Sequence, residues 1–203
     1  MKGKQMSTAL FNIDSDLILT NTLPLDDLRH WWETRQSDPD SVIAFTDDSP
    51  RNFIDLVDRI QRGSYLFYLA YEKDCVAGAM WLHDIVYDAE GLPYAGWLGT
   101  YVLLEYRGAS TALQMWNQMR EFLLQQGIES VYIASHHQNT RAHAVAERHL
   151  GFHKVGVYPA FARCQGKATD FLIFSMRQVD MTEAWTLAHQ RAGQQVRACA
   201  QAA

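Results

Sequence analysis

The sequence predicts an α+β domain in which a mixed, mostly antiparallel sheet is flanked by helices. Residues 64–104 contain three runs rich in aromatic and β-branched residues, separated by short polar turns, and this pattern is typical of an antiparallel meander. From residue 111 onward, amphipathic helical segments alternate with short β-runs, which adds strands through crossover connections. With 203 residues, of which 48% are hydrophobic and 20% charged, the chain can form one core without disulfides or metal ions.

Two helices are expected before the meander, after a short strand within residues 11–20. Pro24 and the acidic residues that follow it suit the first turn of a helix, because proline lacks the amide hydrogen and acids favour the positive end of the dipole. Residues 50–61 predict a second helix that Gly63 ends. The positions expected to face the core are Leu25, Leu28, Trp31 and Trp32 in the first helix and Phe53, Ile54, Val57 and Ile60 in the second.

The remaining elements follow from the same reasoning. Leu113, Trp116, Met119 and Leu123 repeat at helical spacing in residues 111–126, and Gly127 ends that helix. A further helix is expected over residues 139–150, ended by Gly151. The expected strands are 64–71, 76–87, 94–104, 130–135, 153–163 and 169–176. We therefore expect one domain over residues 1–177 and a tail over 178–203, which is rich in alanine and glutamine and predicts at most one appended helix.

Charge and cysteine content narrow the class of protein. A net charge of −5 is a poor match for a nucleic-acid backbone. The cysteines Cys75, Cys164 and Cys199 are far apart and form no C-x-x-C pair, which argues against a metal site or a disulfide framework. The chain also lacks an apolar run of about 18 residues and a signal-peptide pattern near residue 1. We therefore expect a cytoplasmic protein with reduced thiols, no membrane contact and no bound metal.

The turn between the third strand and the helix at residue 111 has the properties of a diphosphate cradle. Residues 108–112 are small, so their backbone N–H groups can approach a ligand closely, and a helix begins there. Arg107 adds a full positive charge. An ordinary strand-to-helix turn also uses small residues, and Ser110 or Thr111 would then serve only as the N-cap.

This turn resembles the first signature of the GNAT superfamily of N-acetyltransferases. The matching residues are Val102, Glu105, Tyr106, Arg107 and Ala112, whereas Leu104 replaces the usual proline and Ser110 the middle glycine. The resemblance implies that the diphosphate of acetyl-CoA binds here. The residues it assigns to coenzyme binding are Tyr101, Val102, Leu103, Arg107, Gly108, Ala109, Ser110, Thr111 and Ala112.

A second GNAT signature follows about 30 residues later, where Asn139, Ala142, Gly151 and Phe152 match. The resemblance implies that Asn139 and Ala142 flank the pantetheine arm of the coenzyme. The family tyrosine that protonates the departing thiolate is absent. Counting forward from Asn139 and back from Gly151 gives positions that differ by one, so this helix is expected to carry one extra residue. The resemblance is clearest over residues 64–177.

In this family the amine attacks the thioester directly, so the resemblance implies three tasks for the protein. A backbone N–H near Val102 or Leu103 would stabilise the oxyanion. A base must remove a proton from the amine, whose pKa near 10 keeps it protonated at neutral pH. The candidate bases are His83, Asp84, Glu105, His136 and His137. For protonation of the thiolate the candidates are Tyr158 and His149, which helical spacing places on the apolar stripe with Ala142, Val145, Ala146 and Leu150.

The resulting prediction is an acetyl-CoA-dependent N-acetyltransferase that modifies an amine of a small molecule or a protein. Ser110 and the missing tyrosine favour an alternative, in which the protein has lost catalysis and binds an acyl-CoA or a protein partner. Acetylation of aminoacyl-tRNA fits the acidic net charge poorly. The pairs Trp31-Trp32 and Phe67-Tyr68 are candidates for an aromatic acceptor pocket or for the core, and the tail and aromatic strands are candidates for a homodimer contact.

Overall fold

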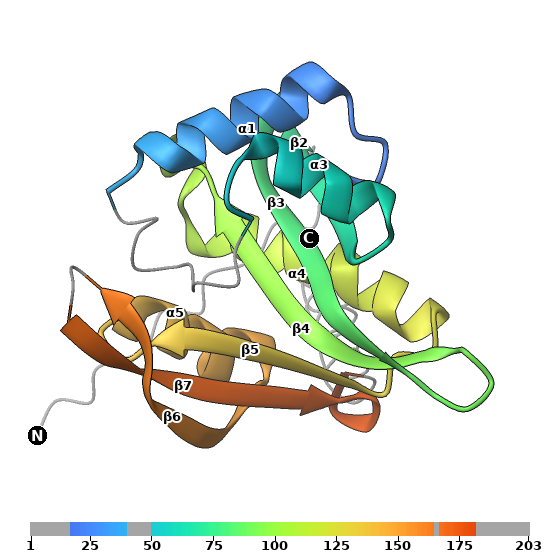
Figure 1. Cartoon of the computed structure of the whole chain (residues 1–203), viewed down its shortest axis with the longest axis vertical. Coiled ribbons are helices and arrows are strands. Elements are labelled where there is room, and N and C mark those ends of the chain that lie inside the picture. The colour runs from blue at the N-terminus through green and yellow to red at the C-terminus, as the bar shows by residue number, and fades with distance from the viewer. Residues whose placement is uncertain (1–16, 40–49, 165–166, 182–203) are drawn as a thin grey trace, which may run out of the picture.

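The computed structural model describes residues 17–39, 50–164 and 167–181, which form a seven-stranded sheet covered by helices on both faces (Figure 1). The strand order is β1-β2-β3-β4-β5-β7-β6. Only the β4–β5 pair is parallel among the described strands. The strands are β1 Leu17–Thr20, β2 Tyr65–Glu72, β3 Cys75–Tyr87, β4 Pro93–Val102, β5 Ser130–His136, β6 His153–Cys164 and β7 Lys167–Arg177. The predicted mixed, mostly antiparallel sheet is confirmed.

The helices form two layers on opposite faces of this sheet (Figure 1). α1 and α3 cover one face, and α4 and α5 cover the other. The helices are α1 Leu25–Ser37, α3 Phe53–Gln61, α4 Ala109–Gln125 and α5 Thr140–Val145. A 3-10 turn, Leu104–Tyr106, links β4 to α4, and a π-helical turn, Ala146–Leu150, continues α5.

Each strand feeds both layers because successive side chains point to opposite faces. Phe67 and Trp81 pack under α1 and α3, whereas Tyr68, Met80 and Leu82 pack under α4. The aromatic side chains therefore divide between two cores. Trp31 of α1 meets Phe67 and Trp81 edge to face, with ring centroids 5.2 and 5.9 Å away. The sheet face under α1 and α3 forms part of the wall of the candidate site.

Three local predictions need correction. Leu25 and Ile54 are 54% and 78% exposed, and Leu56 is the most buried residue of α3, while the predicted Phe53, Val57 and Ile60 are partly buried and pack against the same core. α4 begins at Ala109 with Gly108 as its N-cap, two residues before the predicted start. Neither Ser110 nor Thr111 therefore occupies the N-cap position. The glycines Gly63, Gly127 and Gly151 end their helices in the left-handed region, as predicted.

The π-helical turn after α5 gives the predicted extra residue a place. A π-helical turn contains one residue more than an α-helical turn, so it absorbs an insertion without shifting the flanking elements. The N–H of Phe152 donates to the carbonyl of Ala146 at 3.0 Å, and Gly151 leaves the helix with φ of 83°. Phe152 is thereby buried against Trp116 of α4.

The parallel strands β4 and β5 separate along their length, and this separation positions the site. They pair only from Ala95 to Trp97 on β4 and from Ser130 to Tyr132 on β5. Beyond these residues the two strands run apart (Figure 1). Each strand keeps its outer partner, since β4 continues to pair with β3 and β5 with β7.

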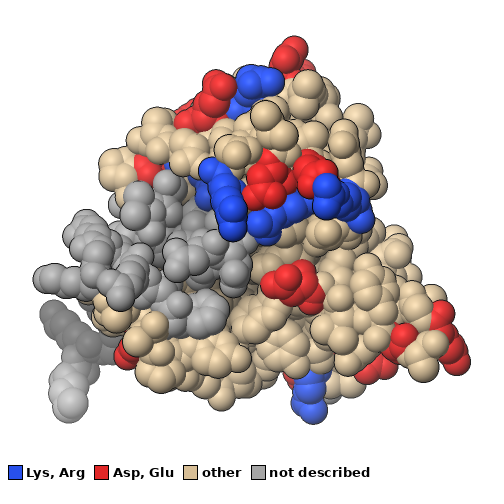
Figure 2. All heavy atoms as spheres, viewed as in Figure 1, with Lys and Arg blue, Asp and Glu red and all other residues tan. Residues whose placement is uncertain are grey.

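The described surface shows charges of both signs in close proximity. On the face in Figure 2, the blue and red atoms gather over the layer of α1 and α3, where Arg59 pairs with Asp55 and Arg62 with Asp58 on α3. Much of the rest of this face is uncharged (Figure 2). Among the helices in the described residues, none has the length and hydropathy of a membrane span.

Candidate active site

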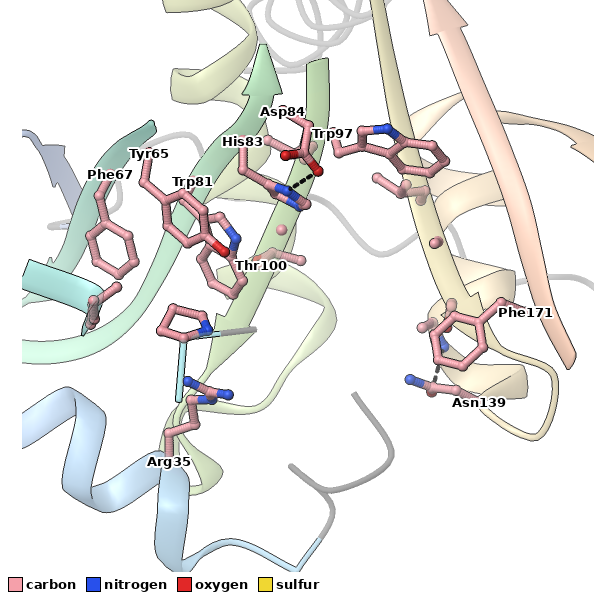
Figure 3. A pocket seen from close by; sticks show the side chains of 18 of the residues that line it. Arg35, Tyr65, Phe67, Trp81, His83, Asp84, Trp97, Thr100, Asn139 and Phe171 are labelled. Atoms are coloured by element: carbon pink, nitrogen blue, oxygen red, sulfur yellow. Dashed lines mark hydrogen bonds and ion pairs between the residues drawn. The ribbon is translucent and has the colours of Figure 1, made fainter. Parts of the chain in front are cut away.

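A cavity of about 380 Å³ lies where β4 and β5 separate, beneath the end of α1 (Figure 3). The walls come from α1, α3 and strands β2 to β7, with Asn139 and Ala142 at the start of α5. The lining side chains are mostly apolar or aromatic, with a few polar groups, which is the usual composition of a small-molecule site. The lining includes Arg35, Tyr65, His83, Asp84, Trp97, Gly99, Thr100, Asn139 and Tyr158.

The main chain of β4 presents hydrogen-bonding groups to this cavity. The N–H of Leu103 donates to the carbonyl of Ala77 in β3 at 2.9 Å. Because antiparallel pairs alternate, the N–H and C=O groups of Thr100 and Val102 then point away from β3, toward the gap that opens beside β5. The contact between the N–H of Glu129 and the carbonyl of Tyr94 at 2.8 Å has the same parity. The Leu103 amide is therefore engaged in the sheet and cannot serve the predicted oxyanion role, whereas those of Thr100 and Val102 face the gap.

The N-terminus of α4 has the features expected of an anion site. Gly108 is the N-cap in an extended conformation, and no side chain caps the first turn. The first turn also contains no acidic residue. The backbone N–H groups of the first turn and the helix dipole thus present positive potential just beyond the end of β4. This agrees with the small residues that the sequence places at 108–112.

Arg107 lies differently from the sequence-based expectation. Its guanidinium pairs with the buried carboxylate of Asp38, just after α1, and donates to the hydroxyl of Tyr101 at 3.0 Å. Its Nε donates to the carbonyl of Val102 at 3.2 Å. Tyr101 also donates to Asp38, and burial with this nearby carboxylate raises the pKa of Tyr101. The positive charge of Arg107, predicted to bind the diphosphate, is therefore neutralised by Asp38. Tyr101, predicted to bind the coenzyme, is buried in the core beside α1.

Asn139 and Ala142, which the second signature assigns to the pantetheine arm, both lie at the start of α5. Asn139 is the N-cap of α5, and its side-chain oxygen accepts the N–H of Ala142 at 3.2 Å. Both residues line the cavity, and Asn139 lies on the wall opposite β3 and β4 (Figure 3). An N-cap uses the amide oxygen and leaves the NH2 group for a further contact. Asn139 can therefore hold a ligand and start the helix at the same time.

The structure does not bring His136 or His137 to the cavity. His136 is 2% exposed, and its Nδ1 accepts the N–H of Gln138 at 3.1 Å. Its Nε2 lies 2.6 Å from the hydroxyl of Thr169, which is also 3.1 Å from Nδ1 of His137. A neutral imidazole has one acceptor nitrogen, and in His136 the backbone occupies it. We conclude that His136 links β5 to β7 through its contact with Thr169 and is a poor candidate for the base.

Helical spacing predicts that His149 lies on the buried stripe of its helix, and the structure places it elsewhere. The side chain is exposed and does not contribute to the cavity. The π-helical turn changes the angular position of residues 146–150, so the regular stripe expected from the sequence ends at Ala146. His143 is instead the buried histidine of this segment, against the ring of Phe174.

The two buried histidines predict a dependence of stability on pH. Burial lowers the pKa of both His136 and His143, and in His136 the neighbouring histidines lower it further. The unfolded chain retains the ordinary value near 6.5, so it binds more protons than the folded protein just below that pH. We expect the melting temperature to be highest above pH 6.5 and to fall as the pH decreases below it. Thermal unfolding between pH 8 and 5 tests this, and a melting temperature that is flat across this range would contradict it.

Of the predicted bases, His83 and Asp84 line the cavity. The Nδ1 of His83 lies 3.0 Å from a carboxylate oxygen of Asp84, and the imidazole faces the ring of Tyr65 at 5.4 Å (Figure 3). Adjacent strand residues normally point to opposite faces. Asp84 instead has φ of 47°, within an irregularity of the β3–β4 register between His83 and Val86. This bulge turns the carboxylate back toward the imidazole, as bulges near binding sites often do.

Tyr158 of β6 also lines the cavity, and it is 48% exposed. Of the two predicted proton donors, it is therefore the one that the structure places at the site. Glu105 lies in the 3-10 turn after β4 and outside the cavity lining. Sequence reasoning missed Arg35, Trp97 and Thr100, because nothing local distinguishes them from ordinary helix and strand residues.

The aromatic residues divide between the cavity and the core. Trp31 and Phe67 are buried and also line the cavity, whereas Trp32 and Tyr68 do not line it. Phe67 stacks on Trp81 with centroids 5.7 Å apart and an interplanar angle of 12°. Trp31 and Phe67 therefore belong both to the core and to the cavity wall, whereas Trp32 and Tyr68 belong to the core alone, Tyr68 on the opposite face of the sheet.

The model of the Acetyltransferase (GNAT) family matches residues 25–152. A spermidine N-acetyltransferase from Vibrio cholerae, solved with CoA and spermine, has 16% identity and a TM-score of 0.69, over 82% of this chain and 98% of that one. A microcin C7 self-immunity acetyltransferase, solved with acetyl-CoA and AMP, has 18% identity and a TM-score of 0.63, over 81% and 93%.

A ribosomal-protein-S5-alanine acetyltransferase from Vibrio fischeri has 15% identity and a TM-score of 0.65, over 80% of this chain and 93% of that one. No curated protein matches the chain. At these identities the solved structures show that this chain shares their fold, and the chemistry of its site depends on its own residues.

Proposed function

Because the chain belongs to the GNAT family of acetyltransferases, we propose that it transfers an acetyl group from acetyl-CoA to an amine. The main support is the cavity at the separation of β4 and β5, together with the N-terminus of α4, which no side chain caps and which follows β4 after the 3-10 turn. The described lining of the cavity ends at Thr100 on β4, so the start of α4 lies outside this lining as a separate place for a diphosphate. A coenzyme that carries a diphosphate and an arm with amide groups has the chemistry that this combination would bind.

In this proposal, the diphosphate binds the N–H groups of residues 108–112 at the start of α4. The pantetheine arm extends between β4 and β5, where its amides can pair with the main chain of Thr100 and Val102. The NH2 group of Asn139 holds the arm from the opposite wall. Arg107 shapes the turn through Val102 and Asp38 and does not act as a free charge.

The acetyl transfer then divides among three groups at the cavity. Asp84 accepts the Nδ1 hydrogen of His83, which leaves Nε2 to take the proton from the ammonium group of the acceptor. The amine nitrogen attacks the thioester carbon, a C–N bond forms, and the C–S bond breaks. The N–H of Thr100, which lines the cavity, is placed to stabilise the oxyanion. The phenol of Tyr158 protonates the thiolate, although a thiol with pKa near 8.5 can also leave unaided.

The function is tested by measuring release of free thiol from acetyl-CoA with a broad panel of amines. We expect sustained turnover with at least one amine class and saturable binding of acetyl-CoA by isothermal titration. Absence of acetyl-CoA binding at high micromolar concentration would remove the basis of the proposal.

A second function fits one observation. Arg107 pairs with Asp38, so a bound diphosphate would rely on backbone groups. Weaker coenzyme binding of this kind favours a protein that binds an acyl-CoA as a sensor and does not turn it over. Binding of acetyl-CoA with no thiol release across the whole panel would favour this alternative. Sustained turnover would eliminate it.

Asn139 allows its two roles to be separated by substitution. Asn139→Asp keeps an oxygen that caps α5 but loses the NH2 donor and adds a negative charge. We expect this variant to fold normally and to raise the KM for acetyl-CoA by roughly 10-fold or more. The reason is that it loses one hydrogen bond to the coenzyme and adds a negative charge that repels the polar oxygens of the arm. Asn139→Ala should additionally lose about 1 kcal/mol of stability with the cap. A KM unchanged in both variants would exclude Asn139 from the coenzyme site.

A further inference from the structure

Trp97 closes the cavity at the point where β4 and β5 meet. It is the last residue of β4 that pairs with β5, opposite Tyr132, and the centroids of the two rings lie 5.5 Å apart. The indole lines the cavity, and Figure 3 shows it at the end away from Asn139. Since the strands separate beyond this pair, the gap between them begins at Trp97 and opens in the direction of α4.

The β5 side of this narrow end is apolar. Ile133 and Ala134 directly follow the last paired residue, Tyr132, and both line the cavity. Ala134 lies on the same sheet face as Tyr132, because alternate strand residues point the same way. Its side chain is a single methyl group, which leaves the space between the strands to a ligand. The end of the gap at Trp97 therefore suits a small apolar group.

His83 sets the level of the sheet at which the proposed reaction takes place. It is the register partner of Trp97 in the β3–β4 pair, so the two side chains leave the same face side by side. In the proposed coenzyme position, the arm runs from the start of α4 past Val102 to Thr100. An arm that continues in this direction carries its thioester toward His83 and its acyl group toward Trp97.

The position of the indole limits the length of that acyl group. Trp97 lies three residues before Thr100, about 10 Å along a strand, and the ring occupies part of this space. A short acyl group fits between the N–H of Thr100 and the indole, whereas a long straight chain meets the ring. Tyr132 packs against the other side of the gap, so the indole cannot move aside without disturbing this aromatic pair.

We propose that Trp97 determines which acyl group the protein transfers, as the floor of a pocket that accepts acetyl and rejects a chain as long as hexanoyl. This inference rests on the proposed acetyl transfer and adds to it a residue that sets the choice of donor. The acceptor amine would enter from the β3 side, where Tyr65, Phe67 and Trp81 line the cavity. Trp97 is thus assigned to the acyl donor and not to the acceptor.

The test compares acetyl-CoA with hexanoyl-CoA by release of thiol, using the amine that gives the fastest turnover with acetyl-CoA. We expect the wild type to prefer acetyl-CoA at least 10-fold in kcat/KM, roughly the effect of a methylene group that a pocket cannot fit. In Trp97→Ala we expect the hexanoyl-to-acetyl ratio to rise about 10- to 100-fold, because the chain can occupy the space of the indole. Trp97→Phe, with a smaller ring, should give a smaller rise. Tyr94→Ala is the matched control and should keep the wild-type ratio, because Tyr94 is an exposed aromatic residue of β4 outside the cavity lining.

A ratio measured within one variant does not depend on how much of that variant is folded, and Trp97→Phe replaces Trp97→Ala should the latter fail to fold. An unchanged ratio in the folded variants, or a wild type that uses hexanoyl-CoA as well as acetyl-CoA, would overturn the inference. A changed preference among amines with an unchanged preference among donors would also overturn it and would assign Trp97 to the acceptor.

Failure of the proposed acetyl transfer gives a different result. If acetyl-CoA binds but every amine leaves its thiol unreleased, the acetyl transfer is wrong, and dissociation constants for acetyl-CoA and hexanoyl-CoA from isothermal titration replace kcat/KM. The wild type should then bind acetyl-CoA more tightly, and Trp97→Ala should reduce or reverse the difference. Equal binding of the two thioesters to the wild type would overturn the role of Trp97, and absence of binding of both would remove the coenzyme site together with it.

Discussion

Replacement of His83 by glutamine should lower kcat by about 100-fold or more, the typical contribution of a general base. The imidazole lines the cavity beside Asp84, the other predicted base there, and a carboxylate oxygen of Asp84 lies 3.0 Å from its Nδ1. Glutamine retains the size and polarity of the side chain but cannot accept a proton at neutral pH. The binding of acetyl-CoA should be unchanged, because His83 lies on β3 and the proposed coenzyme slot on the far side of β4.

The pH profile distinguishes loss of a base from general damage. The wild-type rate should fall at acidic pH as the imidazole becomes protonated, and this decline should be absent from the residual rate of His83→Gln. Asp84→Asn supplies a graded comparison, since asparagine tolerates the left-handed backbone of this bulge and still accepts the Nδ1 hydrogen without the charge. We expect its loss of activity to be smaller. His153→Gln, at an exposed histidine of β6, is the control. A kcat within threefold of wild type in His83→Gln would exclude this residue as the base.

The sequence predicts the fold well because the signals that set it are local. Pro24 begins α1, glycines in the left-handed region end three helices, and each predicted strand of the described chain exists with ends shifted by two residues or fewer after residue 64. The family resemblance at residues 101–112 and 139–152 is confirmed by the match of the family model to residues 25–152. Even the extra residue between Asn139 and Gly151 is visible by counting, and the π-helical turn provides for it.

The site is less predictable because its chemistry depends on contacts between distant segments. His136 is adjacent to His137 in sequence, yet its burial depends on Thr169, which reaches it only through the pairing of β5 with β7. The motif assigns Arg107 to a phosphate, but the guanidinium pairs with Asp38, which lies 69 residues earlier. Arg35 has no local signal at all, since its place in the cavity wall follows from where the last turn of α1 crosses the sheet. Local sequence therefore identifies the coenzyme side better than the acceptor side.

Gly99 is the position where a single methyl group should most disturb the acceptor side. A Cβ atom added to Gly99 would lie 2.1 Å from Cε2 of Trp81, and the indole fills the space in which a β4 side chain would otherwise stand. Trp81 cannot withdraw easily, because Phe67 stacks on one side and Trp31 meets it edge to face. We expect Gly99→Ala to cost about 1–3 kcal/mol of folding stability, as overpacked cores do.

The same displacement should affect catalysis more than stability. Trp81 and Gly99 both line the cavity, next to Thr100 with its proposed oxyanion contact, so a tilted indole or a shifted strand alters the place where acceptor and thioester meet. Misplacement by about 1 Å can cost about 100-fold in rate, and we expect kcat/KM to fall by at least 10-fold in steady-state assays. Gly156→Ala is the matched control in β6, because its added Cβ meets no atom within 4 Å. If Gly99→Ala melts and turns over like Gly156→Ala, the indole must have room to move, and the aromatic stack cannot be the rigid wall that the acceptor site requires.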